Sequence, residues 1–362
     1  MLGLIVAAVV KIAIMIGFAV NLSAILTWME RRQSALMQDR IGPVRANIGR
    51  VRLWGLLHPV ADALKLLNKE DFIPPKVHRT VYLLAPLFAL VPVLLAFAVI
   101  PFGPPVCLDK LAVPVADLAQ CQQVEYLQIA HIDIGILFIF AVASLGVYGA
   151  ALAGWASFNN FALLGGLRAS AQMISYEVTM GMAMMGAFLV FGTLEPMAMV
   201  QKQDTLAHWG IVQQPLGFIL FFFAAIAETK RAPFDLPEGE SEIVGYFVEY
   251  GGVRFMTFFL GEFLEIVFVG AIVTTVFLGG WQIPGLQDGA FAHWIVVLLR
   301  VAAFMAKVFV VCFIQLAIRW TLPRMRYDQL MRLGWKGMLP ASIANVVITA
   351  ALVMWSQPGL PR

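Results

Sequence analysis

Eight long apolar runs constrain this chain more than any other feature of its sequence. They lie at about 2–28, 80–101, 131–154, 170–193, 215–228, 254–279, 292–318 and 339–356. A run of about 20 apolar residues matches the thickness of the hydrocarbon core of a bilayer. Only 13% of the residues are charged, whereas soluble domains carry about 25%. The sequence therefore predicts an all-α polytopic membrane protein with about eight transmembrane helices, the short fifth one extending toward Trp209.

Basic residues are distributed unevenly between the loops. Nineteen Lys and Arg residues fall in the odd-numbered loops, whereas the even-numbered loops carry only Lys110 and Lys202. By the positive-inside rule, the odd loops face the cytoplasm (or matrix) and both termini face the other side. We find no repeat of 20–50 residues and no linker, so residues 1–362 are expected to form a single membrane domain. The net charge of +3 gives no indication of nucleic-acid binding.

The loop between the first and second runs contains a helical pattern of its own. Its apolar residues recur at helical spacing within 52–72, at Leu53, Leu56, Leu57, Val60, Ala61, Leu64 and Leu67. This pattern predicts an amphipathic helix on the membrane surface, with Pro59 near its start or at a kink. The apolar face either borders an opening to lipid or packs against protein without a part in ligand entry.

The segment from Glu228 to Gly252 holds six of the chain's 22 acidic residues between two apolar runs. The six are Glu228, Asp235, Glu238, Glu240, Glu242 and Glu249. Carboxylates crowded in a low-dielectric setting repel one another, so some are expected to hold protons near neutral pH. The segment therefore handles protons or docks a partner, unless it is simply a solvated loop. The three charged loops on this side form a platform for a soluble partner or, alternatively, for anionic lipid.

Ionisable residues inside apolar runs are costly to bury, so each needs a partner or a function. Four acids could carry protons laterally if water fills the gaps between them: Asp133, Glu177, Glu228 and Glu262. The alternative is a set of fixed ion pairs, for example Glu265 with Lys307. We expect the Arg300 side chain to reach the lipid edge.

The sequence offers no site for a bound redox cofactor or nucleotide. Its five histidines are scattered, no His and Cys spacing suits zinc, haem or iron–sulfur ligation, and no Gly-rich phosphate loop occurs. Any redox centre is therefore expected in another subunit. Cys107 and Cys121 share the second loop and either pair in an oxidising compartment or stay apart. Cys312 lies in the seventh run and suits a small apolar position.

Five segments together resemble one protein family. They are ERRQSALMQDRIGPVRANIG, GLLHPVADALKLLNKEDF, ALLGGLRASAQMISYEVTMG, AETKRAPFDLPEGESEIVGYFVEY and RWTLPRMRYDQLMRLGWKGMLP. They look like the quinone-site membrane subunit of respiratory complex I (NADH-quinone oxidoreductase), which is designated H in bacteria and 1 in mitochondria. The resemblance covers nearly the whole chain and is weak at about 102–126. Lys230 stands where this family usually has Asn or another polar residue.

The resemblance implies a long tilted first helix and a quinone opening bordered by the first span, the sixth span and the surface helix. The residues implied for the quinone path are Arg31, Arg40, Asp62 and Arg319, with Glu30 and Lys65 beside them. Those implied for the proton path are Glu177, Glu228, Glu249 and Glu262, to which the residue pattern adds Asp133. The loop implied to couple the quinone path to the proton path contains Arg231, Asp235, Glu238, Glu240 and Glu242.

We therefore expect the membrane subunit of a proton-pumping NADH:quinone oxidoreductase, which forms the quinone chamber and its bilayer entrance and does not catalyse alone. The resemblance implies quinone as substrate, with NADH, FMN and iron–sulfur clusters held by partner subunits. Its expected neighbours are the peripheral-arm subunits on the cytoplasmic face, other membrane-arm subunits and lipid. A bacterial inner membrane fits better than a mitochondrial one. The alternatives are a membrane-bound hydrogenase-type complex, a stand-alone proton-linked transporter and a structural anchor.

Overall fold

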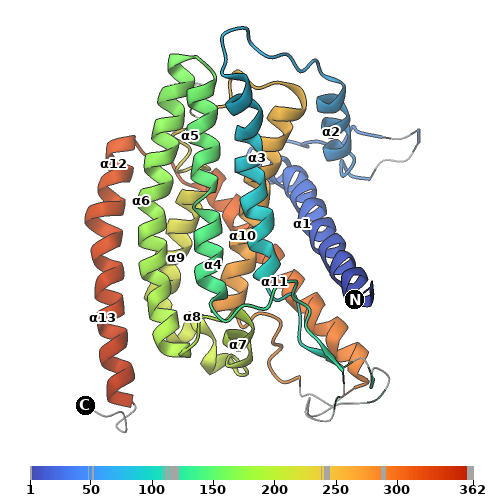
Figure 1. Cartoon of the computed structure of the whole chain (residues 1–362), viewed down its shortest axis with the longest axis vertical. Coiled ribbons are helices and arrows are strands. Elements are labelled where there is room, and N and C mark those ends of the chain that lie inside the picture. The colour runs from blue at the N-terminus through green and yellow to red at the C-terminus, as the bar shows by residue number, and fades with distance from the viewer. Residues whose placement is uncertain are drawn as a thin grey trace.

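The computed structural model describes residues 2–47, 49–50, 53–107, 109–110, 113, 121, 123–237, 239, 245–286 and 291–356 (Figure 1). Within these residues the chain is a bundle of long helices, with one short antiparallel pair of strands, β1 (Val106–Cys107) and β2 (Val124–Glu125). The predicted all-α fold is confirmed.

Seven helical segments of the described chain are long and apolar enough to cross a membrane. They are Ala8–Met37, Arg79–Val99, Gly135–Ala156, Asn160–Phe191, Gly252–Phe277, His293–Thr321 and Tyr327–Trp355. An eighth apolar helix, α9 (Pro215–Glu228), has only 14 residues. The short helix α8 (Gly210–Gln213) precedes it in the direction of Trp209, and only Gln214 separates the two. The seven spans and α9 correspond to the eight predicted runs.

The first helix, α1 (Leu2–Met37), has 36 residues. At 1.5 Å per residue it is about 54 Å long, well beyond the roughly 30 Å of the hydrocarbon core. A helix of this length must tilt or protrude, and Figure 1 shows α1 lying oblique to the other helices. It continues nine residues past the predicted end at 28, so Arg31 and Arg32 belong to the helix rather than to the following loop.

The centre of the bundle is α10 (Gly252–Phe277), which contacts α1, α3 (Arg79–Ala96), α9 and α11 (His293–Thr321). Every residue from Ile266 to Phe277 is buried. A helix that is apolar on all sides is stable only when other helices surround it, which explains this central position. The helix α10 starts two residues before its predicted run, and α11 ends three residues after its own, so Arg254 and Arg319, which were counted with the odd-numbered loops, are helical residues.

The third span is broken into α4 (Gly135–Ala143) and α5 (Gly146–Ala156), and the break at Ser144 and Leu145 was not predicted. Both residues are compatible with a helix, and irregular backbone at this depth depends on the protein packed around it. The span starts four residues later than predicted. The next helix, α6 (Asn160–Phe191), starts ten residues earlier than predicted, so Arg168 is helical. Small residues allow α5 and α6 to approach closely, as is common between membrane helices.

Short elements lie at the ends of the bundle. They are η1 (Phe97–Val99), α7 (Pro196–Gln201), η3 (Leu206–His208), α12 (Tyr327–Arg332) and the π-helical turn η4 (Leu333–Met338). The last helix, α13 (Leu339–Ser356), runs along the bundle (Figure 1). The helix α13 packs against α6. Figure 1 places both ends of the described chain in the lower part of the molecule, away from α2 (His58–Asn68).

The helix α2 is the predicted surface helix. It begins at His58, later than the pattern suggested, and Pro59 lies in its first turn. None of its side chains is fully buried, and Leu64 and Leu67 are each more than half exposed. These exposed apolar side chains agree with a helix that lies along a membrane surface.

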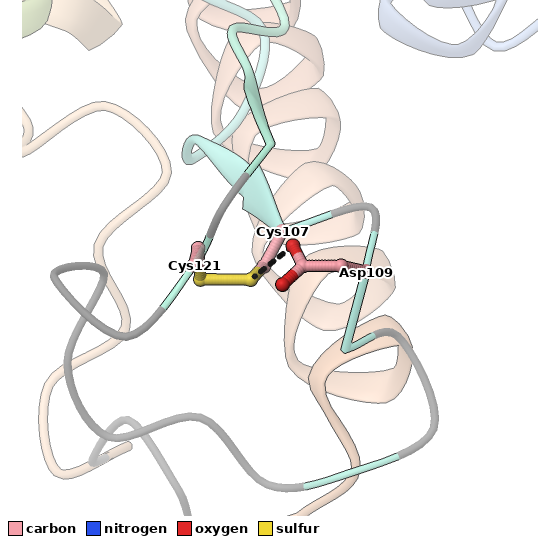
Figure 2. Close-up of side chains that lie close together, drawn as sticks. All are labelled: Cys107, Asp109 and Cys121. Atoms are coloured by element: carbon pink, nitrogen blue, oxygen red, sulfur yellow. Dashed lines mark hydrogen bonds between the residues drawn. A yellow bond between two sulfur atoms is a disulfide. The ribbon is translucent and has the colours of Figure 1, made fainter.

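Cys107 and Cys121 are joined by a disulfide next to the paired strands (Figure 2). Asp109 points toward the bond, with its Oδ1 atom 3.4 Å from the Cys107 Sγ atom. Because both sulfurs are bonded to each other, neither is a thiolate available to a metal ion. The ring of His293 at the start of α11 accepts a hydrogen bond from the backbone N–H of Cys107, so this loop is anchored to the bundle.

The contact between α5 and α6 predicts a sharp difference between two glycines. A Cβ atom on Gly154 would lie 2.5 Å from the Ala162 carbonyl oxygen and 3.1 Å from the Gly166 Cα atom. We expect Gly154→Ala to lower the free energy of unfolding by about 1–3 kcal/mol, because backbone cannot move aside. Gly181→Ala is the matched control on α6, since nothing lies within 4 Å of its added methyl group. Thermal unfolding in detergent, followed by circular dichroism, compares them; equal midpoints would contradict the tight α5–α6 contact.

Candidate functional site

A cavity of about 210 Å³ lies between α1, α2 and α10. Its lining is mostly apolar and includes Val20, Ala24, Ala63, Leu66, Met256, Phe259, Leu260 and Phe263. Asp62 of α2 is the charged residue of the lining, and its Oδ2 atom lies 2.5 Å from Nη2 of Arg31 on α1. This ion pair joins the surface helix to the first span. The cavity thus has two membrane helices and an exposed surface helix as its walls.

Behind one wall of this cavity lies a network of charged residues centred on Glu30. Glu30, near the end of α1, accepts a hydrogen bond from Nη1 of Arg231 at 2.6 Å and a second one from Arg319 of α11. The Arg231 guanidinium also lies 3.5 Å from the Glu262 carboxylate and 4.0 Å from the centre of the Phe263 ring. Since Phe263 lines the cavity, Arg231 connects the cavity wall to both acids.

A second group of charges follows along α10. Glu265 lies one turn after Glu262, and its Oε1 atom is 3.5 Å from Nζ of Lys230. Glu265 and Glu228 both line a small cavity of about 30 Å³, whose walls come mainly from α4, α6, α9 and α10. This volume suffices for about one or two water molecules. Glu177 of α6 is close enough to Glu228 to act on it electrostatically.

The structure therefore places four acids in a row, in the order Glu177, Glu228, Glu265 and Glu262. We refer to this row of acids as the acid file. The sequence suggested Glu265 only as the partner of Lys307, and that pairing is wrong. The sequence did contain a signal for the position of Glu265. It follows Glu262 by three residues, and residues three apart lie on the same face of a helix. The Lys307 ammonium instead donates to the carbonyl oxygens of Leu278, Gly280 and Gln282.

Two other predicted members of the proton path lie apart from this file. Asp133 is exposed and precedes α4, whose first turn hydrogen bonds to the backbone just before α7. The side chain of Glu249 accepts a hydrogen bond from Nδ2 of Asn159 at 2.8 Å, beside the stacked rings of Tyr82 and Tyr250. The expectation that Arg300 reaches the lipid edge is wrong, because its side chain is buried.

The remaining predicted residues are spread over the same end of the bundle as Glu30. Arg40 and Lys65 are exposed. The backbone carbonyl of Asp235 accepts a hydrogen bond from Arg324. Burial raises the pKa of the Asp235 carboxyl, and nearby arginines, Arg324 foremost, oppose that shift. Three predicted acids of this loop, Glu238, Glu240 and Glu242, lie outside the described residues.

This chain is similar to known proteins along nearly its full length. A model of the NADH dehydrogenase family matches residues 10–350. The relatives are the NADH-quinone oxidoreductase subunits designated H. That of Syntrophotalea carbinolica is 42% identical over 348 residues, which are 96% of each chain. The second such subunit of Geobacter metallireducens is 43% identical over 350 residues, again 96% of each. That of Protochlamydia amoebophila is 45% identical over 329 residues, covering 91% of this chain and 92% of the relative.

The geometry around Glu30 predicts a large loss of stability when its charge is removed. Glu30→Gln leaves two guanidinium groups facing each other in a largely buried site, so we expect a loss of about 3 kcal/mol. Asp71→Asn is the control, because the Asp71–Arg254 pair, at 2.9 Å, is more accessible to water and should contribute below about 1 kcal/mol. Thermal unfolding of the assembled complex in detergent measures both. Equal losses in the two variants would contradict a central role for Glu30.

Proposed function

Because this chain belongs to the NADH dehydrogenase family, as a membrane subunit of NADH-quinone oxidoreductase, we propose that its lipid-facing cavity is the entrance for quinone. The chain is a multi-pass inner-membrane protein and part of an oxidoreductase complex. In the proposed arrangement, the quinone tail enters between α1, α2 and α10, and reduction of the head group is linked to proton movement through the buried acids. The single observation that carries this proposal is the position of Arg231, which contacts an acid on each of the two membrane helices that wall the cavity, Glu30 on α1 and Glu262 on α10.

The size and lining of the cavity support a role for the apolar tail. Pockets that enclose a whole small molecule measure about 300–1,000 Å³. A cavity of about 210 Å³ with mostly apolar walls suits a section of an isoprenoid chain better than a complete quinone. The head group would then lie beyond the cavity, toward the charged ends of α1 and α11. The tail can arrive from the bilayer because α2 leaves its own outer face exposed.

The arginines at this end of the bundle suit a head group that gains electrons. Guanidinium stays protonated at all physiological pH values, so Arg31, Arg231 and Arg319 can stabilise negative charge without releasing a proton. Each of them already holds a carboxylate, Asp62 for Arg31 and Glu30 for the other two. A new negative charge nearby would compete with these carboxylates and favour their protonation.

The acids on α6, α9 and α10 provide the proposed continuation for protons. Arg231 touches both Glu30 and Glu262, so a change of charge at Glu30 alters the field at Glu262. From there the proposed path continues to the acids Glu228 and Glu177, which act on each other electrostatically. The protein would thus couple quinone reduction to proton movement through electrostatics and a rearrangement of the loop after α9.

Partner subunits complete this proposal. The loop that begins at Lys230, with Asp235 and the acids 238–242, is proposed to contact the peripheral arm, where NADH, FMN and iron–sulfur clusters belong. A four-thiolate iron–sulfur cluster needs more cysteines than this chain offers, since Cys107 and Cys121 form a disulfide and Cys312 is buried in α11. The excess of basic residues in the odd loops supports termini on the periplasmic side.

Filling the cavity should impair long-tailed quinones selectively. Ala63 lines the cavity, whereas Ala61, on the same helix, is exposed. We expect Ala63→Phe to raise the KM for a long-tailed ubiquinone about tenfold, because the added ring occupies the space of the tail. Ala61→Phe is the matched control and should leave the KM unchanged. Steady-state NADH oxidation by the whole complex measures both, with decylubiquinone as a short-tailed comparison. An unchanged KM in Ala63→Phe would contradict the proposal that this cavity is the quinone entrance.

Neutralising Glu228 should block proton movement without preventing assembly. Gln keeps the size of the side chain but cannot carry a proton, so Glu228→Gln is expected to reduce proton translocation about 100-fold. Glu195→Gln is the control, because Glu195 lies at the start of α7, outside the file, beside His131. Acidification of inverted membrane vesicles driven by NADH is the measurement. Normal acidification with Glu228→Gln would refute the proposed path.

A further inference from the structure

The ion pair between Lys230 and Glu265 is a feature that the path through Glu228 and Glu262 does not by itself require. The Lys230 Nζ atom lies 3.5 Å from the Glu265 Oε1 atom, and the two side chains are only 4% and 14% exposed. Lys230 follows the end of α9 and has a φ of 56°, in the left-handed region. Side chains other than glycine rarely adopt this conformation, and the surrounding structure must hold them there.

Stability does not explain this pair. Desolvation of two charges offsets most of their mutual attraction, so well-packed apolar residues of similar size are usually as stable as a buried ion pair. The Glu265 side chain lies among aliphatic and aromatic residues such as Phe268 and Val269, which would accommodate an apolar replacement. A buried pair that gives little stability at a strained backbone position points to a role in function.

The charges around the pair place it inside the acid file. Glu265 and Glu228 share the small cavity of about 30 Å³. Among the described residues, the charged groups that act on Glu228 are Glu177, Glu265 and Lys230. Those that act on Glu265 are Lys230, Glu262 and Arg231. Lys230 is therefore within electrostatic reach of both carboxyl groups that border the cavity.

We propose that Glu265 carries protons between Glu228 and Glu262, and that Lys230 is the counter-charge that stays with whichever carboxyl group is ionised. This inference rests on the proposed function and deepens it. In the transfer, the O–H bond of the Glu228 carboxylic acid breaks, and one proton passes through water in the cavity to the Glu265 carboxylate. Glu228 becomes negative, Glu265 becomes neutral, and the Lys230 ammonium changes its partner from Glu265 to Glu228.

This arrangement lowers the barrier for a simple electrostatic reason. The three groups Glu228, Lys230 and Glu265 contain one proton on the two carboxyl groups before and after the step, so their net charge stays at zero. A carboxylate that formed without a nearby cation would be strongly disfavoured in this apolar setting. Lys230 removes that penalty at both ends of the step. It is a positioning residue in this scheme, whereas Glu265 itself carries the proton.

The test compares three variants in the assembled complex. Glu265→Gln removes the proton carrier and the carboxylate that lies 3.5 Å from the Lys230 Nζ atom. The double variant Lys230→Asn with Glu265→Gln removes both charges and leaves two neutral amides that can hydrogen bond to each other. Asn also suits the left-handed backbone at position 230. Glu265→Asp keeps a carboxyl group and serves as the conservative variant. NADH-driven acidification of inverted vesicles is measured with decylubiquinone as the acceptor, together with the amount of complex assembled.

A proton-carrying role predicts that the double variant assembles like the unmodified protein but translocates protons about 100-fold more slowly. It also predicts that Glu265→Asp retains most of the translocation. If the double variant translocates normally, the pair is only structural and the inference is overturned. A double variant that fails to assemble overturns it equally, because the pair is then needed for folding.

Glu228→Gln, measured in parallel, separates this inference from the proposed function. Loss of translocation in Glu228→Gln with normal translocation in the double variant would reject only the role of Glu265. Normal translocation in both would reject the whole acid path.

Discussion

One guanidinium group, that of Arg231, joins the two parts of the candidate site. It donates to Glu30 at 2.6 Å, lies 3.5 Å from Glu262 and packs 4.0 Å from the centre of the Phe263 ring. Glu30 belongs to α1, while Glu262 and Phe263 belong to α10, so the contacts of one side chain span both membrane walls of the cavity. A guanidinium cannot lose its proton. A change in the charge of Glu30 or Glu262 must therefore be compensated by the other acid or by a movement of Arg231.

The charges beside α10 serve different purposes at two levels of the helix. Just after its C-terminal end, the Lys307 ammonium donates to three backbone carbonyl groups and lies 4.4 Å from the centre of the Trp209 ring. In a membrane, backbone carbonyl groups outside helices must be satisfied by protein. Lys307 therefore fixes the turn that follows α10. Near the middle of the helix, Arg231 and Lys230 contact the carboxyl groups of Glu262 and Glu265, which can change their charge. This contrast makes the C-terminal end of the central helix rigid and its middle electrostatically adjustable.

The all-α class and the approximate positions of the apolar helices could be predicted from the sequence, because hydropathy reports which residues tolerate hydrocarbon. The ends of the helices could not, and α1 continues through Arg31 to Met37 because helical hydrogen bonding does not stop where lipid does. The partners of the buried charges were the hardest to predict. Lys307 was the partner considered for Glu265 as an example of a fixed ion pair, but the turn after α9 brings Lys230 to within 3.5 Å instead. Such pairings depend on how three helices meet, which no periodicity in the sequence reports.

The balance of charges in this region supports a role in proton coupling rather than in simple anchoring. Three cations, Lys230, Arg231 and Arg319, are joined there to four acids, Glu30, Glu228, Glu262 and Glu265. Among these described groups, one proton shared by the acids makes the set neutral. At an effective dielectric constant of about 20, a unit charge about 8 Å away changes the energy of a carboxylate by about 2 kcal/mol. That exceeds the roughly 1.4 kcal/mol that corresponds to a tenfold change in proton affinity. A negative charge on a nearby quinone head group is therefore sufficient to change where the shared proton resides.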